Sequence, residues 1–177
     1  MHPAKFHQFR VTINTLKDKG HNVEIIILGR DILEELVKKE GWDYTKIFSK
    51  GRKRSWMHIY ISTLVFAFLT VLKLLILTIG KKYDLFITDD LLCYIGKLKK
   101  TPTIFVTDDD VKAVVGSWLV MPVSNYVFSP DICDLDVYEH KKIGYKGYKS
   151  LAHLHPNHLK QILVKYLMNL KIRSISF

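Results

Sequence analysis

Two short apolar runs in the middle of the chain end in the same way. Residues 85–88 are followed by Asp89 and Asp90, and residues 104–107 are followed by Asp108, Asp109 and Asp110. Both runs are continuously apolar rather than alternating, which is typical of strands buried on both faces of a parallel sheet. In such sheets ligands bind outside the carboxyl ends of the strands. The pattern therefore predicts that both acidic clusters face one crevice.

The rest of the apolar pattern alternates between helix and strand periods. Residues 5–20 repeat apolar side chains at spacings of three and four, which predicts a helix. The following segments predict a strand at residues 22–28, a helix at residues 31–41 and a short strand at residues 42–48. This rhythm predicts an α/β fold, with a Rossmann-like parallel sheet and helices on both faces. The expected central strands are residues 23–28, 85–88, 104–107 and 126–128.

The two ends of the chain depart from this architecture. The first predicted helix begins almost at Met1, whereas a strand normally precedes that helix. We expect residues 1–170 to form one Rossmann-like domain that lacks its first strand. Residues 171–177 alternate basic or polar with apolar side chains, so we expect them to start a truncated second domain.

A basic cluster, Lys50, Arg52, Lys53 and Arg54, precedes the most apolar stretch, residues 59–79. The length and the basic flank suit a membrane span, but Lys73 near the centre would be costly there. At helical spacing His58, Ser62, Thr63, Thr70 and Lys73 fall on one side. Three interpretations stay open: a sheet-covering helix that touches a membrane surface, an internal helix, and a true span.

The net charge of the chain indicates a class of partner but does not identify one partner. The formal net charge of +10 favours anionic partners, including an anionic membrane surface. No nucleic-acid motif accompanies the charge, so we expect no nucleic-acid partner. The two cysteines, Cys93 and Cys133, have no metal-binding or redox spacing, and no secretory signal is visible. These features predict a cytoplasmic protein that can associate peripherally with the inner face of the membrane.

Three groups of side chains could carry chemistry, and the first two consist of histidines and of acidic residues. His2 and His7 bracket the start of the first helix, where an imidazole beside free N–H groups suits an anion or a general base; the alternative is a pair of surface histidines. The acidic clusters that contain Asp89 and Asp108 could supply a base, a metal ligand or an acceptor for sugar hydroxyls. Their alternative role is helix capping.

A glycine- and tyrosine-rich segment near the carboxyl end is the third candidate. Residues 144–149 (Gly144, Tyr145, Lys146, Gly147, Tyr148 and Lys149) suit a phosphate-binding loop, and the alternative is a plain turn. His153 and His155 follow, but no Cys or His partner lies at ligand spacing, so we expect no metal site. No cofactor motif is present either.

Four fragments, taken in order, resemble the amino-terminal half of the domain-of-unknown-function family 354: residues 2–7, 16–23, 106–110 and 144–156. The opening His-Pro-Ala-x-x-His and the closing Gly-Tyr-Lys…Ala-His-Leu-His-Pro are specific, whereas the Lys-Gly-His turn is generic. That family is similar to glycosyltransferases of the GT-B fold and to UDP-N-acetylglucosamine 2-epimerases. The resemblance covers nearly the whole chain.

The resemblance implies a two-domain enzyme in which this chain is the amino-terminal, acceptor-side half. The expected partners are a nucleotide-sugar donor, held by the second domain, and a glycan or lipid-linked acceptor used in surface polysaccharide or glycolipid synthesis. We expect the isolated chain to be inactive. The expected catalytic residues are His2, His7, Asp108 and Asp109, and the expected substrate-binding residues are Asp89, Asp110, Gly147, Tyr148, Lys149 and His155. The alternatives are a nucleotide-sugar epimerase-like enzyme and a non-catalytic membrane-associated fragment.

Overall fold

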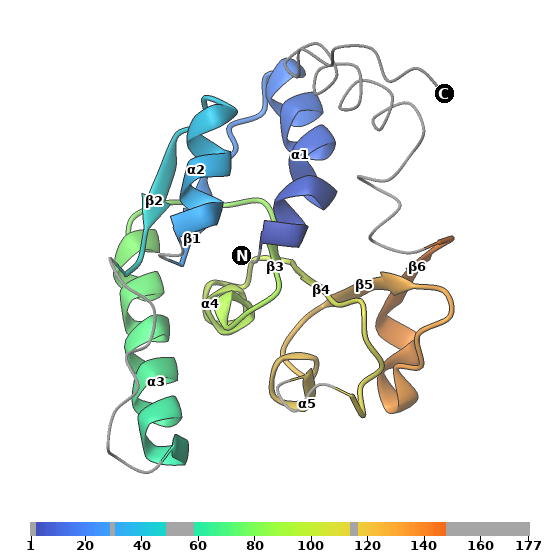
Figure 1. Cartoon of the computed structure of the whole chain (residues 1–177). Helices are drawn as coiled ribbons and strands as arrows, with labels where there is room; N and C mark the ends of the chain where they lie inside the picture. The colour runs from blue at the N-terminus through green and yellow to red at the C-terminus, as the bar shows by residue number, and fades with distance from the viewer. Residues whose placement is uncertain (1–2, 29–30, 49–58, 114–116, 148–177) are drawn as a thin grey trace, which may run out of the picture.

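The computed structural model describes residues 3–28, 31–48, 59–113 and 117–147 (Figure 1). The first half comprises α1 (Pro3–Asp18), β1 (Ile25–Ile27), α2 (Asp31–Lys39), β2 (Tyr44–Lys46) and α3 (Ile59–Thr78). The second half comprises β3 (Phe86–Thr88), α4 (Leu92–Lys99), β4 (Thr103–Val106), α5 (Ser117–Val120), β5 (Tyr126–Pro130), a 3₁₀ helix (Asp136–Lys141) and β6 (Lys142–Tyr145). The predicted alternation of helices and strands is confirmed.

Every strand pair among the described residues is parallel, as predicted for a Rossmann-like α/β fold. Strands β3, β4, β5 and β6 form one sheet in that order, with Ile87 opposite Ile104 and Phe105 opposite Val127. Strands β1 and β2 form a separate two-stranded sheet, with Ile26 opposite Thr45. The expectation that residues 23–28 are a central strand of the same sheet therefore needs correction, because β1 does not pair with β3.

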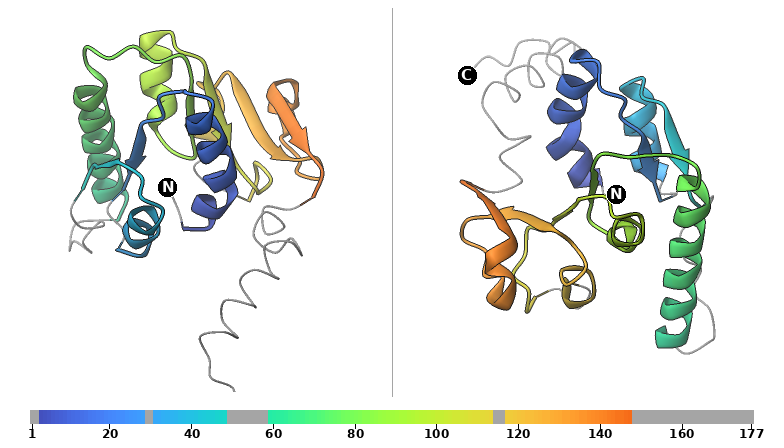
Figure 2. Two further views of the ribbon diagram at one scale, coloured as in Figure 1. Left: turned by 90° about the horizontal axis from the view of Figure 1, so that it is seen from above. Right: turned by 180° about the vertical axis from the view of Figure 1, so that it is seen from behind.

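Helices cover the strands from two sides, which explains why the strand residues are apolar (Figure 2). On one side α1 lies beside α2, and Phe6 joins Ile25, Leu33 and Trp42 in one buried cluster. On the other side α3 lies beside α4, and Leu74 joins Phe86 in a second cluster. A third cluster under β4 and β5 contains Cys93, Phe105, Val120, Met121, Val127 and Leu135.

Helix α3 buries two of its polar side chains and leaves much of its apolar surface exposed. Thr70 and Thr78 are buried, and the Lys73 ammonium donates a hydrogen bond to the Ile47 carbonyl at 3.1 Å and lies 4.1 Å from the centre of the Phe48 ring. Thr70 and Thr78 thus face the protein, whereas Thr63 and Lys73 of the same polar stripe remain exposed. The exposed side of α3 is apolar: Ile61, Leu64, Val65, Phe68, Leu69, Leu72 and Ile76, with Ile79 just beyond.

Strand β6 occupies part of the segment that sequence reasoning treated as a loop or turn. Residues 142–145 pair in parallel with β5, so Gly144 and Tyr145 belong to the sheet. Only Lys146 and Gly147 follow it within the described residues, with Gly147 at a positive φ of 104°. The expected start of a second domain at residues 171–177 lies outside the described residues.

Candidate functional site

The carboxyl ends of β3 to β6 bring together polar side chains from four segments. Because the strands are parallel, Asp89 after β3, Asp108 after β4 and Asp131 after β5 follow the same edge of the sheet. Tyr145, the last residue of β6, lies at that edge too. This is the edge at which open parallel sheets bind ligands. We therefore take it as the candidate site.

The best-defined contact at this edge joins Asp108 and Tyr145. The Tyr145 hydroxyl donates a hydrogen bond to Asp108 Oδ1 at 3.3 Å. The Tyr145 ring stacks on Phe128, with 4.7 Å between ring centres and 22° between planes. Burial, together with the negative charge of Asp108, raises the pKa of Tyr145 to about 12. The phenol therefore keeps its proton at neutral pH and remains a donor.

Asp131 reaches the same edge by a close approach to β6. Its backbone N–H donates to the Tyr145 carbonyl at 2.9 Å. A Cβ at Gly144 would lie only 2.0 Å from Asp131 Oδ1. Glycine at this position therefore lets the Asp131 carboxylate lie against the strand. The Lys142 ammonium supports this turn by donating to the carbonyls of Asp131 and Cys133, at 3.0 and 2.6 Å.

Several of the predicted acidic residues have local structural partners. Asp110 Oδ1 accepts a hydrogen bond from the Asp134 N–H at 2.8 Å, which ties the loop after β4 to the loop after β5. Asp90 Oδ1 accepts one from the Leu91 N–H at 2.8 Å, immediately before α4. The Asp109 N–H donates to Thr107 Oγ1 at 3.4 Å. These bonds of Asp90 and Asp110 fit the capping and turn alternative, whereas Asp108 has a side-chain partner across the sheet.

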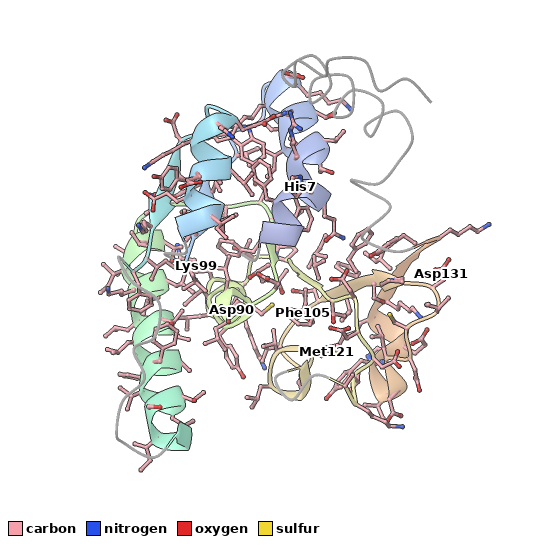
Figure 3. The ribbon with its side chains drawn as sticks, viewed as in Figure 1. His7, Asp90, Lys99, Phe105, Met121 and Asp131 are labelled. Carbon is pink, nitrogen blue, oxygen red and sulfur yellow. The ribbon has the colours of Figure 1, made fainter. Side chains whose placement is uncertain are left out.

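The predicted site residues do not all come together. His7 lies on α1, edge-on to Phe6 with 5.3 Å between ring centres. Figure 3 shows it well separated from Asp131, which lies beyond β5. Gly147 follows the carboxyl end of β6 and so lies on the site's side of the sheet. The candidates His2, Tyr148, Lys149 and His155 lie outside the described residues.

Sequence reasoning missed three residues at this edge. Tyr145 belongs to the predicted phosphate-binding loop but was not assigned a role, and no role was assigned to Asp131. Ser129, in β5, is buried, and its hydroxyl has no hydrogen-bond partner within the part of the chain that the structure describes. The only available signal was positional: Ser129 and Asp131 flank Pro130 at the end of a predicted strand.

The described residues contain no group of three or more His, Cys, Asp or Glu side chains that could hold a metal ion. They contain one helix, over residues 61–78, whose length and composition would allow it to cross a membrane, a test that the core helix of a soluble protein can also pass. In comparisons with known proteins, no family model, no curated protein and no solved structure matches the chain.

Proposed function

We propose that the chain is the acceptor-binding half of a sugar transferase of the GT-B type, with its acceptor site at the carboxyl edge of β3 to β6. The observation that carries the proposal is the contact between Asp108 and Tyr145 at this edge. Together with the stacked Phe128 ring it combines a carboxylate, a protonated phenol and an aromatic face.

These groups suit the chemistry of a sugar hydroxyl. A carboxylate accepts a hydrogen bond from the hydroxyl and can take its proton as a general base when the hydroxyl attacks a donor. The Tyr145 phenol can donate a hydrogen bond to a ring or hydroxyl oxygen of the same sugar. In this arrangement Asp108 has the role of base, and Tyr145 and Asp131 orient the acceptor.

The site is assigned to the acceptor rather than to the nucleotide. No cluster of basic side chains converges on this edge among the described residues: Lys142 bonds to backbone carbonyls and to Glu139, and Lys141 bonds to the carbonyls of Met121, Pro122 and Ser124. We therefore expect UDP-sugars to bind the chain weakly, through its net charge of +10, and to be displaced by salt.

Saturation-transfer NMR with a panel of mono- and disaccharides, and with UDP-N-acetylglucosamine, tests this assignment. We expect saccharide contacts that weaken in Asp108→Asn and in Tyr145→Phe. Asp84→Asn is the matched control, because Asp84 is an exposed acid at the opposite, amino end of β3. Salt-insensitive binding of the UDP-sugar that depends on Asp108 would place the nucleotide, not the acceptor, at this edge. Saccharide contacts unchanged in both variants would also contradict the proposal.

Helix α3 favours a second candidate function, association with an anionic membrane surface. The helix buries Thr70 and Thr78 but leaves a row of large apolar side chains exposed, which is unusual for a helix in water. Leu64 and Phe68 are 70% and 68% exposed. The basic residues at 50–54 precede this helix in sequence, and each basic side chain near an anionic surface contributes about 1 kcal/mol. The two functions are compatible if the acceptor is lipid-linked.

Liposome flotation tests the membrane association. We expect stronger recovery on anionic than on neutral vesicles, and a loss of recovery when Lys50, Arg52, Lys53 and Arg54 are changed to Ser or when Leu64 and Phe68 are changed to Ser. Ile132→Ser is the matched control, because Ile132 is equally exposed, at 68%, but lies away from α3. Equal recovery on both vesicle types contradicts the proposal. Resistance to carbonate extraction would favour a spanning helix instead.

A further inference from the structure

The exposed apolar side chains of α3 lie on one side of the helix along its whole length. Because an α-helix turns by about 100° per residue, the exposed apolar positions from Ile61 to Ile79 fall within an arc of about 140°. At 1.5 Å per residue this stripe is about 27 Å long. The other side of the helix is taken by the protein, since Thr70, Leu74 and Thr78 are buried. Helix α3 therefore presents a continuous apolar stripe rather than an isolated patch.

Lysine side chains gather just beyond the carboxyl end of this stripe. Lys81 and Lys82 follow the helix directly and are exposed. The end of α4 lies beside them, because the Lys99 ammonium donates hydrogen bonds to the Thr78 carbonyl and, at 2.8 Å, to the Lys81 carbonyl. Lys100, the next residue, is exposed as well. The end of α3 and the end of α4 thus form one basic surface.

Neighbouring acids do not neutralise this surface. Residues 81–84 and 97–100 contain five lysines and one carboxylate, that of Asp84. Glu24 supplies a second carboxylate, which accepts from the Lys81 ammonium at 2.8 Å, yet the Lys81 side chain remains 49% exposed. The positive charge of this surface therefore exceeds the negative charge around it.

Helix capping explains one of these lysines. Basic side chains near the carboxyl end of a helix offset its dipole. Lys99 has this role for α3, because its ammonium bonds to the Thr78 carbonyl. Lys82 and Lys100, in contrast, remain exposed to solvent. Their charge is therefore accessible to an anionic partner.

We propose that Lys81, Lys82 and Lys100 form a second binding site for anionic lipid headgroups, and that α3 lies flat in the membrane interface instead of crossing it. This inference rests on the membrane association proposed above. The apolar stripe begins after the basic cluster at residues 50–54 and ends at these lysines, so basic residues flank it on both sides in sequence. A crossing helix would place one of the two basic groups beyond the membrane, against the preference of Lys and Arg for the cytoplasmic side. A helix in the interface plane keeps both groups at headgroup level and buries its apolar side by about 5–10 Å.

The apolar stripe favours a lipid surface over a soluble polyanion as the partner. Ile76 and Ile79, which immediately precede the lysines, are 61% and 66% exposed. A bilayer would cover these side chains while its headgroups meet the lysines, whereas a nucleic acid or an acidic peptide would leave them in water. The protein side of α3 stays in place in this arrangement, because Leu74 packs with Phe86 of β3.

Vesicle sedimentation tests the headgroup site in the full chain. The double variant Lys81→Ser, Lys82→Ser should bind mixed phosphatidylcholine and phosphatidylglycerol vesicles about thirtyfold more weakly, because each basic residue near an anionic surface contributes a factor of about five. The matched control, Lys112→Ser with Lys146→Ser, makes the same charge change at exposed positions of the larger sheet, across the molecule from α3 (Figure 1). An equal loss in both double variants would overturn the proposal. So would a Lys81, Lys82 variant that loses binding to heparin but not to vesicles.

Nitroxide labels on introduced cysteines test the orientation of the helix. Labels at Ile61→Cys, Leu72→Cys and Ile79→Cys sample the stripe from end to end, and Thr63→Cys, exposed on another side of the helix, is the control. The two native cysteines are buried. On anionic vesicles we expect the three stripe labels to be shielded equally from aqueous nickel, and the Thr63 label to remain accessible.

Unequal depths would overturn the flat orientation. A crossing helix would place the Leu72 label deep and the other two near opposite surfaces, and a helix inserted by its first half would shield Ile61 but not Ile79. If the chain still binds anionic vesicles in either case, the proposed membrane association stands and only this inference fails. If the chain does not bind vesicles at all, both fail.

Discussion

Gly96 is the position at which one added carbon should most clearly disturb the sheet. It lies in α4, is buried, and faces β3 and β4. A Cβ built there would lie 2.0 Å from Thr103 Cγ2, 3.1 Å from the Thr101 carbonyl oxygen and 3.3 Å from the Phe86 ring. The Thr103 methyl cannot easily rotate away, because its hydroxyl donates to Asn125 Oδ1 at 3.1 Å and accepts from the Asn125 N–H at 3.3 Å. We therefore expect Gly96→Ala to push α4 away from the strands.

Two opposing effects set the magnitude. Overpacking a core by one carbon typically costs about 1–3 kcal/mol. Replacing glycine by alanine inside a helix stabilises it by about 1 kcal/mol. The contact at 2.0 Å is far inside van der Waals range and involves a fully buried neighbour, so the upper part of the overpacking range applies. We expect a net loss of about 1–2 kcal/mol, and each kcal/mol lowers Tm by about 2–4 °C in a domain of this size.

Urea and thermal unfolding measure this loss, and a double-mutant cycle tests its cause. Thr103→Ser removes the methyl that Gly96→Ala would meet but keeps the hydroxyl bonds to Asn125, so the double variant should be more stable than the sum of the single losses predicts. Leu98→Ala is the control, because Leu98 is on the same helix but exposed, and should change stability little. An unchanged or raised stability for Gly96→Ala, or strict additivity in the cycle, would refute the packing argument.

Three further outcomes follow from the titrating groups. Hydrogen bonds led by Lys46 lower the pKa of Glu34 to about 2, so the advantage of wild type over Glu34→Gln in urea unfolding should be full above pH 5 and disappear as pH falls toward 2. Burial and the charge of Asp108 raise the pKa of Tyr145 to about 12, so NMR titration of the tyrosine rings should show a lower pKa for Tyr145 in Asp108→Asn. The contribution of the Tyr145 phenol to stability should be complete below pH 10 and lost as pH rises through 12. Burial, then the charge of Asp90, raises the pKa of the Cys93 thiol to about 12, so this thiol should react with a disulfide reagent only after unfolding, and fast reaction in the native protein would contradict its burial.

The strands of the larger sheet were the most predictable part of the fold. The runs at 85–88 and 104–107 are continuously apolar and end at Thr, and they contain the parallel strands β3 and β4. Strand β6 was not recognised, since Lys142, Ile143, Gly144 and Tyr145 form no apolar run. It forms at the outer edge of the sheet, where pairing with one neighbouring strand, β5, is sufficient and polar side chains remain in solvent.

The contacts of the candidate site could not be read from spacing. Sequence reasoning correctly expected acidic residues at the strand ends, but it could not choose among them. Asp108 and Tyr145 meet although they are 37 positions apart, and the contact depends on the pairing of β5 with the unpredicted β6. Asp110, two residues from Asp108, instead bonds to a neighbouring loop. Local turn geometry, which one sequence does not determine, separates these two roles.

The exposed apolar surface of α3 could not be predicted from periodicity, and it bears on function. Periodicity identifies the polar stripe of a helix but not what covers it. The Thr70 and Thr78 hydroxyls bond to the carbonyls of Phe66 and Leu74 in their own helix, at 2.7 and 2.9 Å, so they can be buried at little cost. Lys73 is likewise satisfied by the Ile47 carbonyl. The two buried threonines therefore do not require water, and much of the apolar surface of the helix remains exposed.

The exposed part of α3 is concentrated in its first half, which relates the two proposed functions. Residues 61–69 contain no buried side chain, whereas Thr70, Leu74 and Thr78 in the second half are buried, and Figure 1 shows α3 extending beyond the strands at one end. Phe48, just after the carboxyl end of β2, stacks on Phe66 with 4.9 Å between ring centres, so the first half of α3 lies beside the carboxyl end of β2. A membrane that receives this half of α3 would bring lipid headgroups toward the candidate site. A lipid-linked sugar, more readily than a free one, would then reach Asp108 and Tyr145.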